Sequence, residues 1–400
     1  MSDNMEALYQ QRLQRYVTAL RNGKPDRVPV RPLAAEFVAT YAGYTCQEIT
    51  QDYTKAFDAV CKCANEFQWD ACVGNMVYVW TALTQAMGLK YYASPGVEIS
   101  ADTAFQYLEP PAHAAHMLPE EYDALIEDPT AFLFNTWFPR VSNDVNAPGD
   151  AVTFRHNMAL VKGGMSMLQY FGALGQQNAR LRAECGTTPA IGGMLKAPMD
   201  IIADKLRGYI GLTEDLLTIP EKVKGAAQAL VPHLTHMAVA LSGADPERNA
   251  PVAFWMHRGC VPFVKQEHFD AIYWPTLKQV IEGIWSQGLQ TLFYAEGDWT
   301  AHLESFAELP EKSIVFHLDQ SDPLETQRVL GKKFCITGGV PNALLAYGTE
   351  DEVRAKCKEL IDLCAPDGGY CMDASAIMQN DSKPENVRAM TDFTVEYGKY

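Results

Sequence analysis

The chain has 400 residues, of which 48% are apolar and 20% are charged, and its formal net charge is −16. This composition can bury a sizeable core, and the acidity argues against nucleic acid or an anionic membrane as a partner. No run of about eighteen apolar residues occurs, and the polar N-terminus lacks the apolar stretch of a secretion signal. The sequence therefore predicts a cytoplasmic protein, whose ten scattered cysteines are reduced and mostly packed in the core.

The first half of the chain alternates between helical patterns and short strands. A polar helix is predicted at 5–22, and a strand bounded by prolines follows at 26–32. Further helices are predicted at 51–66, 154–184 and 221–242, and further strands at 70–74 and 189–193.

The second half of the chain contains five successive units in which a strand precedes a helix. The strands are predicted at 251–257, 289–296, 313–319, 333–339 and 369–373. Short connections between such units imply a parallel sheet, and continuous apolar strands imply that both of its faces are covered. With the units upstream, and without a G-x-G-x-x-G fingerprint, the pattern favours a single (β/α)8 barrel over an open doubly wound sheet. We therefore expect residues 1–400 to form one barrel domain with an N-terminal helical extension.

Side chains that can carry charge or bind a metal stand at the ends of these strands, where a barrel places its active site. They are His257, Glu296 with Asp298, His317 with Asp319, and Cys371 with Asp373. A catalytic zinc ion binds three such side chains and keeps one position open, which makes Glu296, His317 and Cys371 candidate ligands. Alternatively, Glu296 and His317 form a buried hydrogen-bonded pair. His257 could bind substrate, bind a metal or pack in the core.

Aromatic and thioether residues also follow several predicted strands, at 75–80, 192–199 and 254–256. A mouth lined in this way suits an aromatic or otherwise apolar ligand, although any one of these residues could simply belong to the core. The candidates for substrate binding are Asn75, Tyr78, Trp80, Met194 and Met256.

Two stretches of the sequence resemble the uroporphyrinogen decarboxylase superfamily. One is the ending "GGVPNALLAYGTEDEV" with the later "PENVRAM", and the other is the opening pattern R-x-x-x-x-L-x-N-G-K-P-D-R-V-P-V. The resemblance covers most of the chain and implies a single (β/α)8 barrel. It is less specific for activity, because the superfamily contains both decarboxylases and methyltransferases.

The decarboxylases of this superfamily carry a motif of the type M-R-Q-A-G-R after the first strand, whose arginines hold substrate carboxylates. The corresponding stretch here is "VRPLAAEFVATYAGY", in which Arg31 is the only arginine. A porphyrinogen with eight carboxylates needs more cationic partners than this. The resemblance therefore favours the methyltransferases, which pass methyl groups to or from a corrinoid protein.

Some members of the methyltransferase branch bind zinc through H-x-C on one strand and a cysteine near P-G-C on the last strand. Here H-x-C falls on residues 294–296, where Glu296 replaces the cysteine, and "MDAS" stands in place of P-G-C. The sequence resembles instead the O-demethylase methyltransferases, which bind zinc through glutamate and histidine. Glu296 and His317, with twenty residues between them, match the second half of that spacing, whereas the upstream Glu282 is one residue short. Cys371 is favoured as the third ligand over Asp319, Asp373 and His257.

This resemblance implies a zinc-dependent methyltransferase that cleaves an aryl methyl ether of the guaiacol, vanillate or veratrole type. The methyl group would pass to the Co(I) state of cobalamin, a corrinoid carried by a partner protein, and Tyr294, His257 or Asp298 would supply a proton. Two rival functions are a metal-free decarboxylase and a non-catalytic binding protein of the same superfamily. Whether the protein forms a homodimer is left open.

Overall fold

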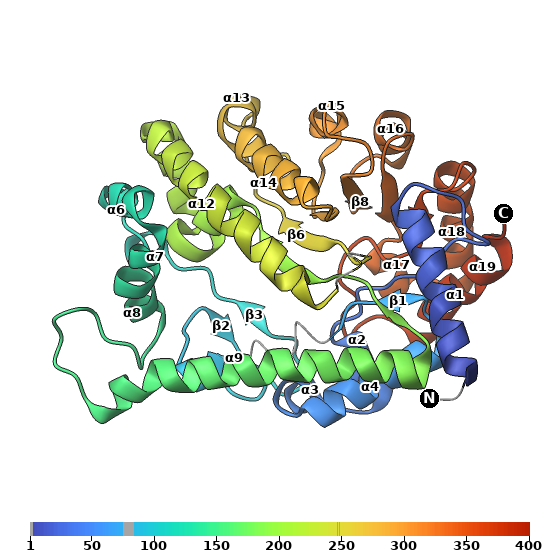
Figure 1. Ribbon diagram of the computed structural model, residues 1–400, viewed down its shortest axis with the longest axis horizontal. Coiled ribbons are helices and arrows are strands. Elements are labelled where there is room, and N and C mark those ends of the chain that lie inside the picture. The colour runs from blue at the N-terminus through green and yellow to red at the C-terminus, as the bar shows by residue number, and fades with distance from the viewer. Residues whose placement is uncertain (1–2, 75–83, 246, 248) are drawn as a thin grey trace.

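The computed structural model describes residues 3–74, 84–245, 247 and 249–400 (Figure 1). Its main sheet consists of six parallel strands in the order β10-β9-β8-β7-β6-β5. Their bounds are Gly193–Lys196 (β5), Val252–Met256 (β6), Thr291–Ala295 (β7), Ile314–Leu318 (β8), Cys335–Gly338 (β9) and Tyr370–Cys371 (β10). Each strand from β6 to β10 is followed by a helix, so the α/β class predicted from the sequence is confirmed.

Further backbone pairing lies outside the main sheet. Strand β1 (Ala71–Cys72) pairs in parallel with β4 (Thr188–Pro189), and the chain continues from β4 into β5. The predicted first strand is seen around Val30, which forms a parallel bridge with Met372, next to β10. The Val30 carbonyl also accepts a hydrogen bond from the Ala71 amide at 3.3 Å. Hydrogen bonds thus connect β10, the Val30 segment, β1 and β4 in turn.

Helices cover the strands, as Figure 1 shows for α12, α14, α15 and α16. The longer helices are Asp3–Leu20 (α1), Tyr53–Glu66 (α4), Phe154–Arg180 (α9), Gly208–Thr218 (α11), Pro220–Leu241 (α12), Trp274–Ser286 (α14), Glu350–Cys364 (α18) and Pro384–Tyr397 (α19). The shorter ones are Phe37–Ala42 (α2), Cys46–Gln51 (α3), Tyr122–Glu127 (α6), Pro129–Phe132 (α7), Phe138–Val141 (α8), Pro198–Ile201 (α10), Gln266–His268 (α13), Leu303–Ala307 (α15), Pro323–Leu330 (α16) and Asn342–Tyr347 (α17).

Local sequence sets where several of these helices begin. Thr153 and Thr349 form capping boxes at the starts of α9 and α18, and prolines occupy the first positions of α12 and α19. The predicted N-terminal helix at 5–22 is found as α1. Among the described residues, no helix combines the length and the apolar content that a membrane crossing requires.

Three regions differ from the sequence prediction. The strand predicted at 189–193 falls across two strands, because β4 ends at Pro189 and β5 begins at Gly193 and pairs with β6 as far as Lys196 and Trp255. The sequence also gave no sign of the antiparallel pair β2 (Tyr92–Ala93) and β3 (Gln106–Tyr107), or of the helical segment 198–218. That segment contains a π-helical turn, η5 (Ile202–Arg207), between α10 and α11.

The parallel register arranges the side chains of the sheet in levels. Trp255, Tyr294, His317, Thr337 and Cys371 are level with one another on neighbouring strands, and we call them the inner row. His257 and Glu296 come two residues later on β6 and β7, and we call them the mouth layer. Because strand residues alternate between faces, the intervening positions, such as Phe254, Phe293 and Phe316, pack in the core between strands and helices.

Candidate active site

A cavity of about 620 Å³ opens at the carboxyl ends of β5, β6 and β7. Most of its wall is apolar or aromatic, including Phe105, Tyr107, Trp137, Met194, Trp255 and Ile377. The groups that can carry charge are Glu36, Lys196, Asp204, Lys205, His257 and Glu296. An apolar cavity with a few convergent polar groups is the usual form of a small-molecule site.

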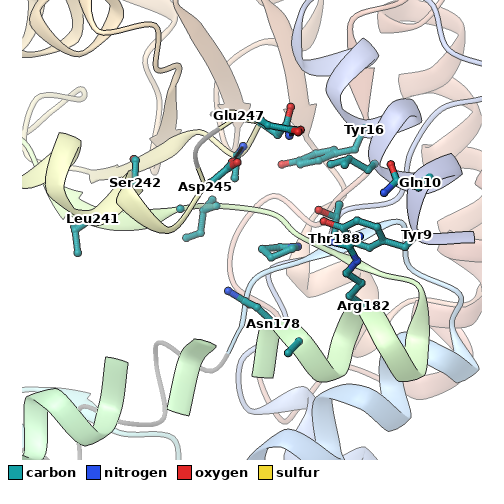
Figure 2. Close-up of a pocket in the computed structure, with 17 residues that line it drawn as sticks. Tyr9, Gln10, Tyr16, Asn178, Arg182, Thr188, Leu241, Ser242, Asp245 and Glu247 are labelled. Carbon is teal, nitrogen blue, oxygen red and sulfur yellow. Dashed lines mark hydrogen bonds between the residues drawn. The ribbon is translucent and has the colours of Figure 1, made fainter. Parts of the chain in front are cut away.

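A second cavity, of about 550 Å³, lies at the opposite ends of the strands. Figure 2 shows Tyr9, Gln10 and Tyr16 reaching it from α1, and its wall continues through Thr188 and Gly192, which precede β5. In parallel α/β folds of this kind, chemistry is concentrated at the carboxyl ends of the strands, whereas the amino ends serve stability. The first cavity is therefore the candidate active site.

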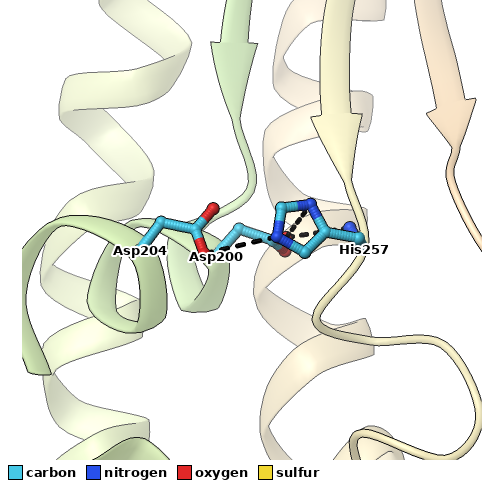
Figure 3. Close-up of side chains that lie close together, drawn as sticks. All are labelled: Asp200, Asp204 and His257. Atoms are coloured by element: carbon cyan, nitrogen blue, oxygen red, sulfur yellow. Dashed lines mark hydrogen bonds and ion pairs between the residues drawn. The ribbon is translucent and has the colours of Figure 1, made fainter. Parts of the chain in front are cut away.

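His257, directly after β6, is held between two buried carboxylates (Figure 3). Its Nε2 lies 3.3 Å from Asp204 Oδ1, and its backbone amide donates to Asp200 Oδ1 at 3.0 Å. With the ring proton on Nε2, toward Asp204, the lone pair of Nδ1 is left available. Among the described residues Nδ1 has no hydrogen-bond partner, although it is buried. The structure thus leaves one ring nitrogen unpaired beside the cavity, 4.0 Å from Asp200 Oδ1 and 3.8 Å from Glu296 Oε2.

Both carboxylates already accept hydrogen bonds from protein donors. Asp200 accepts from the backbone amides of His257 and Arg258 and from the Tyr273 hydroxyl at 2.8 Å. Asp204 accepts from Lys196 at 2.6 Å and from Arg258 at 2.9 Å. Burial alone would raise the pKa of Asp204, but the hydrogen bond to His257 and the two cations lower it below its ordinary value. Asp204 is therefore an ionised group that positions His257.

Glu296, directly after β7, lines the same cavity and lies beside His257. Its Oε2 lies 3.8 Å from His257 Nδ1 and accepts a hydrogen bond from the Trp255 indole. The side chain of Glu296 is 43% exposed, so the carboxylate is open to the cavity. His257 and Glu296 thus come together, as their common level on neighbouring strands requires.

His317 lies deeper, in the inner row, and both of its ring nitrogens have partners. Nδ1 is 3.2 Å from Arg31 Nη2, and Nε2 is 3.0 Å from the Ser375 carbonyl. Its imidazole stacks on Tyr294 with 4.1 Å between ring centroids. Burial and the Arg31 guanidinium lower the pKa of His317 well below its ordinary value, so the ring is neutral. Nδ1 accepts from Arg31, and Nε2 donates to Ser375.

The remaining predicted site residues lie in separate surroundings. Cys371 is 0% exposed, with its Sγ 3.9 Å from Cys335 Sγ in the interior. Asp298 accepts from the Thr300 amide and hydroxyl, which closes the turn after β7. The Tyr294 hydroxyl is buried and has no hydrogen-bond partner among the described residues.

Glu296, His317 and Cys371, predicted as one zinc site, are therefore not brought together. His317 is level with Tyr294, two residues before Glu296, which places it about 6.6 Å deeper along the strand direction. Cys371 is level with His317 through Thr337. The residue level with Glu296 on β8 is Asp319, whose Oδ2 accepts from the Gly297 amide at 2.8 Å.

The residues predicted to bind substrate divide into three groups. Met194 lines the cavity. Met256 is 0% exposed and packs in the core between strands and helices. Asn75, Tyr78 and Trp80 lie outside the described residues.

Sequence reasoning missed four ionisable residues of the cavity wall: Glu36, Lys196, Asp204 and Lys205. Glu36 begins α2, is 2% exposed, and its Oε1 has no partner among the described groups; burial raises the pKa of Glu36 to about 7. Lys205 lies on η5, and burial, aided by Lys196, lowers the pKa of Lys205 to about 7. Glu36 follows the first strand as Glu296 follows β7, which is a signal that could have identified it. Nothing in the sequence marks Lys205.

The donor atoms can be compared with the needs of a metal ion. Within the described part of the chain, three potential ligands converge to within 4.8 Å of one another, namely Asp200, Asp204 and His257. Because both aspartates are saturated by protein donors, the open ligand atoms are His257 Nδ1 and the Glu296 carboxylate, 3.8 Å apart. Zinc bonds of about 2.0–2.2 Å to nitrogen and oxygen would span that separation. The mouth layer therefore offers a metal two open ligand atoms, one fewer than the three of a catalytic zinc site, whereas Glu296, His317 and Cys371 do not converge at all.

Comparisons with known proteins agree with this architecture. The sequence model of the family "Uroporphyrinogen decarboxylase (URO-D)" matches residues 159–397. A curated uroporphyrinogen decarboxylase of Anaeromyxobacter dehalogenans (strain 2CP-C) is 23% identical over 208 residues, which are 52% of this chain and 58% of that protein. The chain thus matches little more than half the length of that relative.

A solved structure, described as a methyltransferase from Methanosarcina mazei, shares the fold with a TM-score of 0.65 and 14% identity. The superposition covers 96% of this chain and 98% of that one. Because the family match spans more than half of the sequence, the chain belongs to the uroporphyrinogen decarboxylase family.

Proposed function

We propose that this family member is a zinc-dependent methyltransferase that removes the methyl group of an aryl methyl ether and delivers it to the Co(I) corrinoid of a partner protein. The observation that carries the proposal is the cavity, in which aromatic walls surround an open histidine nitrogen and an open carboxylate. Such a lining suits an uncharged ring whose one reacting group meets the polar residues.

We also infer that the strands close into a (β/α)8 barrel and that residues 1–400 form one domain. The support is the run of backbone hydrogen bonds from β10 through the Val30 segment to β1 and β4, which continues into β5. A barrel would leave its carboxyl end open above the mouth layer, where a corrinoid protein could approach the substrate.

Decarboxylation of a porphyrinogen, the alternative function, is disfavoured by how the cations are used. A substrate with several carboxylates needs several free guanidinium or ammonium groups. Arg31 is 1% exposed, lies 3.4 Å from Asp373 and donates to Thr337 at 2.8 Å. Lys196 and Arg258 both bond to Asp204. Of the two lysines in the cavity wall, only Lys205 is without a carboxylate partner among the described residues, which is too little positive charge for a polycarboxylate.

The proposed reaction needs help at the leaving oxygen, because a phenolate leaves poorly from a neutral ether. Attack on the methyl carbon breaks the carbon–oxygen bond and leaves the electron pair on the oxygen, which must then receive a proton. Glu36 can donate it, since its buried carboxyl is protonated up to about pH 7 and its Oε1 is unpartnered among the described groups. When held by His257 and Glu296, zinc would supply a Lewis acid that polarises the ether oxygen.

The test is an anaerobic assay that combines the purified protein, a reduced corrinoid and a methoxylated aromatic, with the demethylated phenol as the measured product. We expect turnover by the unaltered protein and a loss of about a hundredfold or more in the double variant His257→Gln, Glu296→Gln. Glu304→Gln, whose side chain is 79% exposed on α15, is the matched control and should keep full activity. Full turnover by the double variant would refute the assignment of the mouth layer.

A further inference from the structure

The end of the cavity formed by η5 and the β2–β3 pair contains a buried ammonium group that the proposed reaction does not use. Lys205 Nζ donates to the Tyr92 hydroxyl at 2.9 Å. It also lies over the rings of Tyr91, Tyr92 and Tyr107, with 4.5, 4.7 and 4.9 Å to the ring centroids. Lys205 and two of these rings, Tyr92 and Tyr107, line the cavity. The aromatic rings therefore fix the ammonium group at the cavity wall.

Within the described parts of the chain, this ammonium group has no carboxylate counter-ion. No carboxylate lies within 4.0 Å of Lys205 Nζ among the described residues, and positions 1–2, 75–83, 246 and 248 contain no acidic residue. The adjacent Asp204 is occupied by Lys196, Arg258 and His257. Charges buried in proteins are normally paired, so a lysine in this position calls for an anion from outside the chain.

A second donor stands beside the ammonium group. The Tyr107 hydroxyl is buried and has no hydrogen-bond partner among the described groups. Its ring is one of those that hold Lys205. An anion with two acceptor oxygens could accept from Lys205 Nζ and from this hydroxyl together, which would satisfy both groups at once.

We propose that Lys205 and Tyr107 form a subsite for a carboxylate carried by the aromatic ring of the substrate. This inference rests on the proposed function and specifies its substrate class, an aryl methyl ether with a ring carboxylate rather than a neutral guaiacol or veratrole. The ring would lie between the aromatic walls, with its carboxylate at Lys205 and its methoxy group at His257 and Glu296.

The fold keeps the carboxylate subsite at Lys205 and the reacting end of the cavity at His257 at a fixed spacing. Lys205 follows Asp204 directly on η5, and Asp204 holds the imidazole of His257. The Trp137 indole donates to the Lys205 carbonyl at 2.6 Å, which ties the turn to η3 (Leu133–Trp137). The position of the methoxy group relative to the carboxylate should therefore decide which ring isomers react.

Proton uptake gives the subsite a signature of its own. Burial and Lys196 lower the pKa of free Lys205 to about 7, and a bound carboxylate would raise it. Glu36, elsewhere on the cavity wall, also has a pKa raised to about 7 by burial, so the uptake is measured in a Glu36→Gln background. The groups packed against Lys205 do not titrate between pH 6 and 9. Asp204 stays ionised, His116 has a pKa lowered to about 4 by burial and by Lys90 and Lys205, and burial raises the pKa values of Tyr91, Tyr92 and Tyr107.

The test is calorimetric binding of 3-methoxybenzoate and of the neutral 3-methoxybenzyl alcohol to the full chain, without corrinoid. We expect the carboxylate to bind about tenfold to a hundredfold more tightly at pH 6.5, and Lys205→Met to abolish this preference. At pH 8, buffers of different ionisation enthalpy should reveal uptake of close to one proton per carboxylate bound by Glu36→Gln and none by Lys205→Met in the same Glu36→Gln background. Lys90→Met, which removes an exposed charge outside the cavity wall, is the control that should bind like the unaltered protein.

Equal affinity for the two compounds, or a preference that survives in Lys205→Met, would overturn the proposal. If Lys205→Met is misfolded by its circular dichroism, Tyr107→Phe decides, and an unchanged carboxylate preference in that variant overturns the subsite. Because binding is measured without methyl transfer, the two proposals fail separately. Carboxylate preference without demethylation would remove the proposed function only, and demethylation with equal binding of the two compounds would remove the subsite only.

Discussion

His317 in the inner row and His257 in the mouth layer stand on parallel strands of one sheet, and each lies near carboxylates. His317 is buried, neutral and bonded through both ring nitrogens to Arg31 and Ser375. His257 is bonded through one ring nitrogen, and the other faces Glu296 across 3.8 Å. The difference is whether the protein already bonds both ring nitrogens of the histidine.

A ring nitrogen that is already bonded stabilises a fold, whereas an unbonded one is available to a ligand. Arg31, Asp373 and Thr337 surround His317, although Arg31 Nη1 and Asp373 Oδ2, 3.4 Å apart, have no hydrogen-bond partner among the described groups. The mouth layer, together with Glu36 and Lys205, leaves donors and acceptors open around an apolar cavity. A residue type at a strand end therefore identifies a functional group only when its bonding is known as well.

The largest expected effect is on stability and concerns the inner row. Arg31→Met removes the cation beside Asp373 and His317, and we expect the free energy of unfolding to fall by about 3–5 kcal/mol, because a buried carboxylate loses its partner. Urea unfolding followed by circular dichroism measures it. Arg354→Met, which breaks exposed pairs on α18, should cost no more than about 0.5 kcal/mol. A loss below about 1 kcal/mol for Arg31→Met would contradict the structural role of the cluster.

The next effect is on metal affinity. We expect His257→Ala to lower the affinity for zinc by about a hundredfold or more, because it removes one of the two open ligand atoms. Cys371→Ala should leave the affinity unchanged, since the thiol is buried against Cys335. Competition with a chromophoric chelator measures both constants. Loss of zinc in Cys371→Ala, with its retention in His257→Ala, would return the metal to the inner row.

A smaller effect concerns the proton donor. Glu36→Gln should reduce kcat by about tenfold to a hundredfold, because an amide cannot protonate the leaving oxygen. In the unaltered protein the raised pKa of about 7 keeps Glu36 protonated at lower pH, so kcat should be constant below pH 7 and fall above it. The kcat of the variant should lose this dependence. An unchanged kcat–pH profile in Glu36→Gln would exclude this residue as the donor.

The smallest effect tests the support of Glu296. Trp255→Phe keeps the aromatic wall but removes the indole hydrogen bond to Glu296 Oε2. The loss of one charge-assisted hydrogen bond at a partly exposed carboxylate should reduce kcat/KM by no more than about tenfold. Stability should change little, so activity and thermal unfolding must be compared in the same preparation. A reduction as large as that of the double variant His257→Gln, Glu296→Gln would mean that Trp255 itself acts in the reaction.

Much of the sheet could be predicted because its strands are apolar runs that end abruptly in polar residues. The predictions around β6, β7 and β8 match the structure to within two residues at each end. The sequence does not show the register, that is, which residues of neighbouring strands lie side by side. The pair His317 and Asp319 offers two polar residues at one strand end, and only pairing between strands shows that Asp319 is level with Glu296. For this reason Glu296 and His317 looked like partners when they belong to different levels.

The cavity wall was harder to predict, because it is built from segments without a clear pattern. Tyr92 and Tyr107 lie on the short antiparallel pair, and Lys205 lies in the helical segment 198–218, neither of which the sequence indicated. The shifted pKa values of Glu36 and Lys205 arise from burial, which is a tertiary property. Met194 was the predicted binding residue whose position after a strand end did lead to the cavity.

In the proposed reaction the mouth layer, and not the inner row, carries the chemistry. The most direct test compares demethylation of a methoxylated aromatic, with reduced corrinoid, by His257→Gln and by Cys371→Ala. The account predicts a loss of about a hundredfold in His257→Gln and near-normal turnover in Cys371→Ala. Near-normal turnover in His257→Gln together with inactive, correctly folded Cys371→Ala would contradict it.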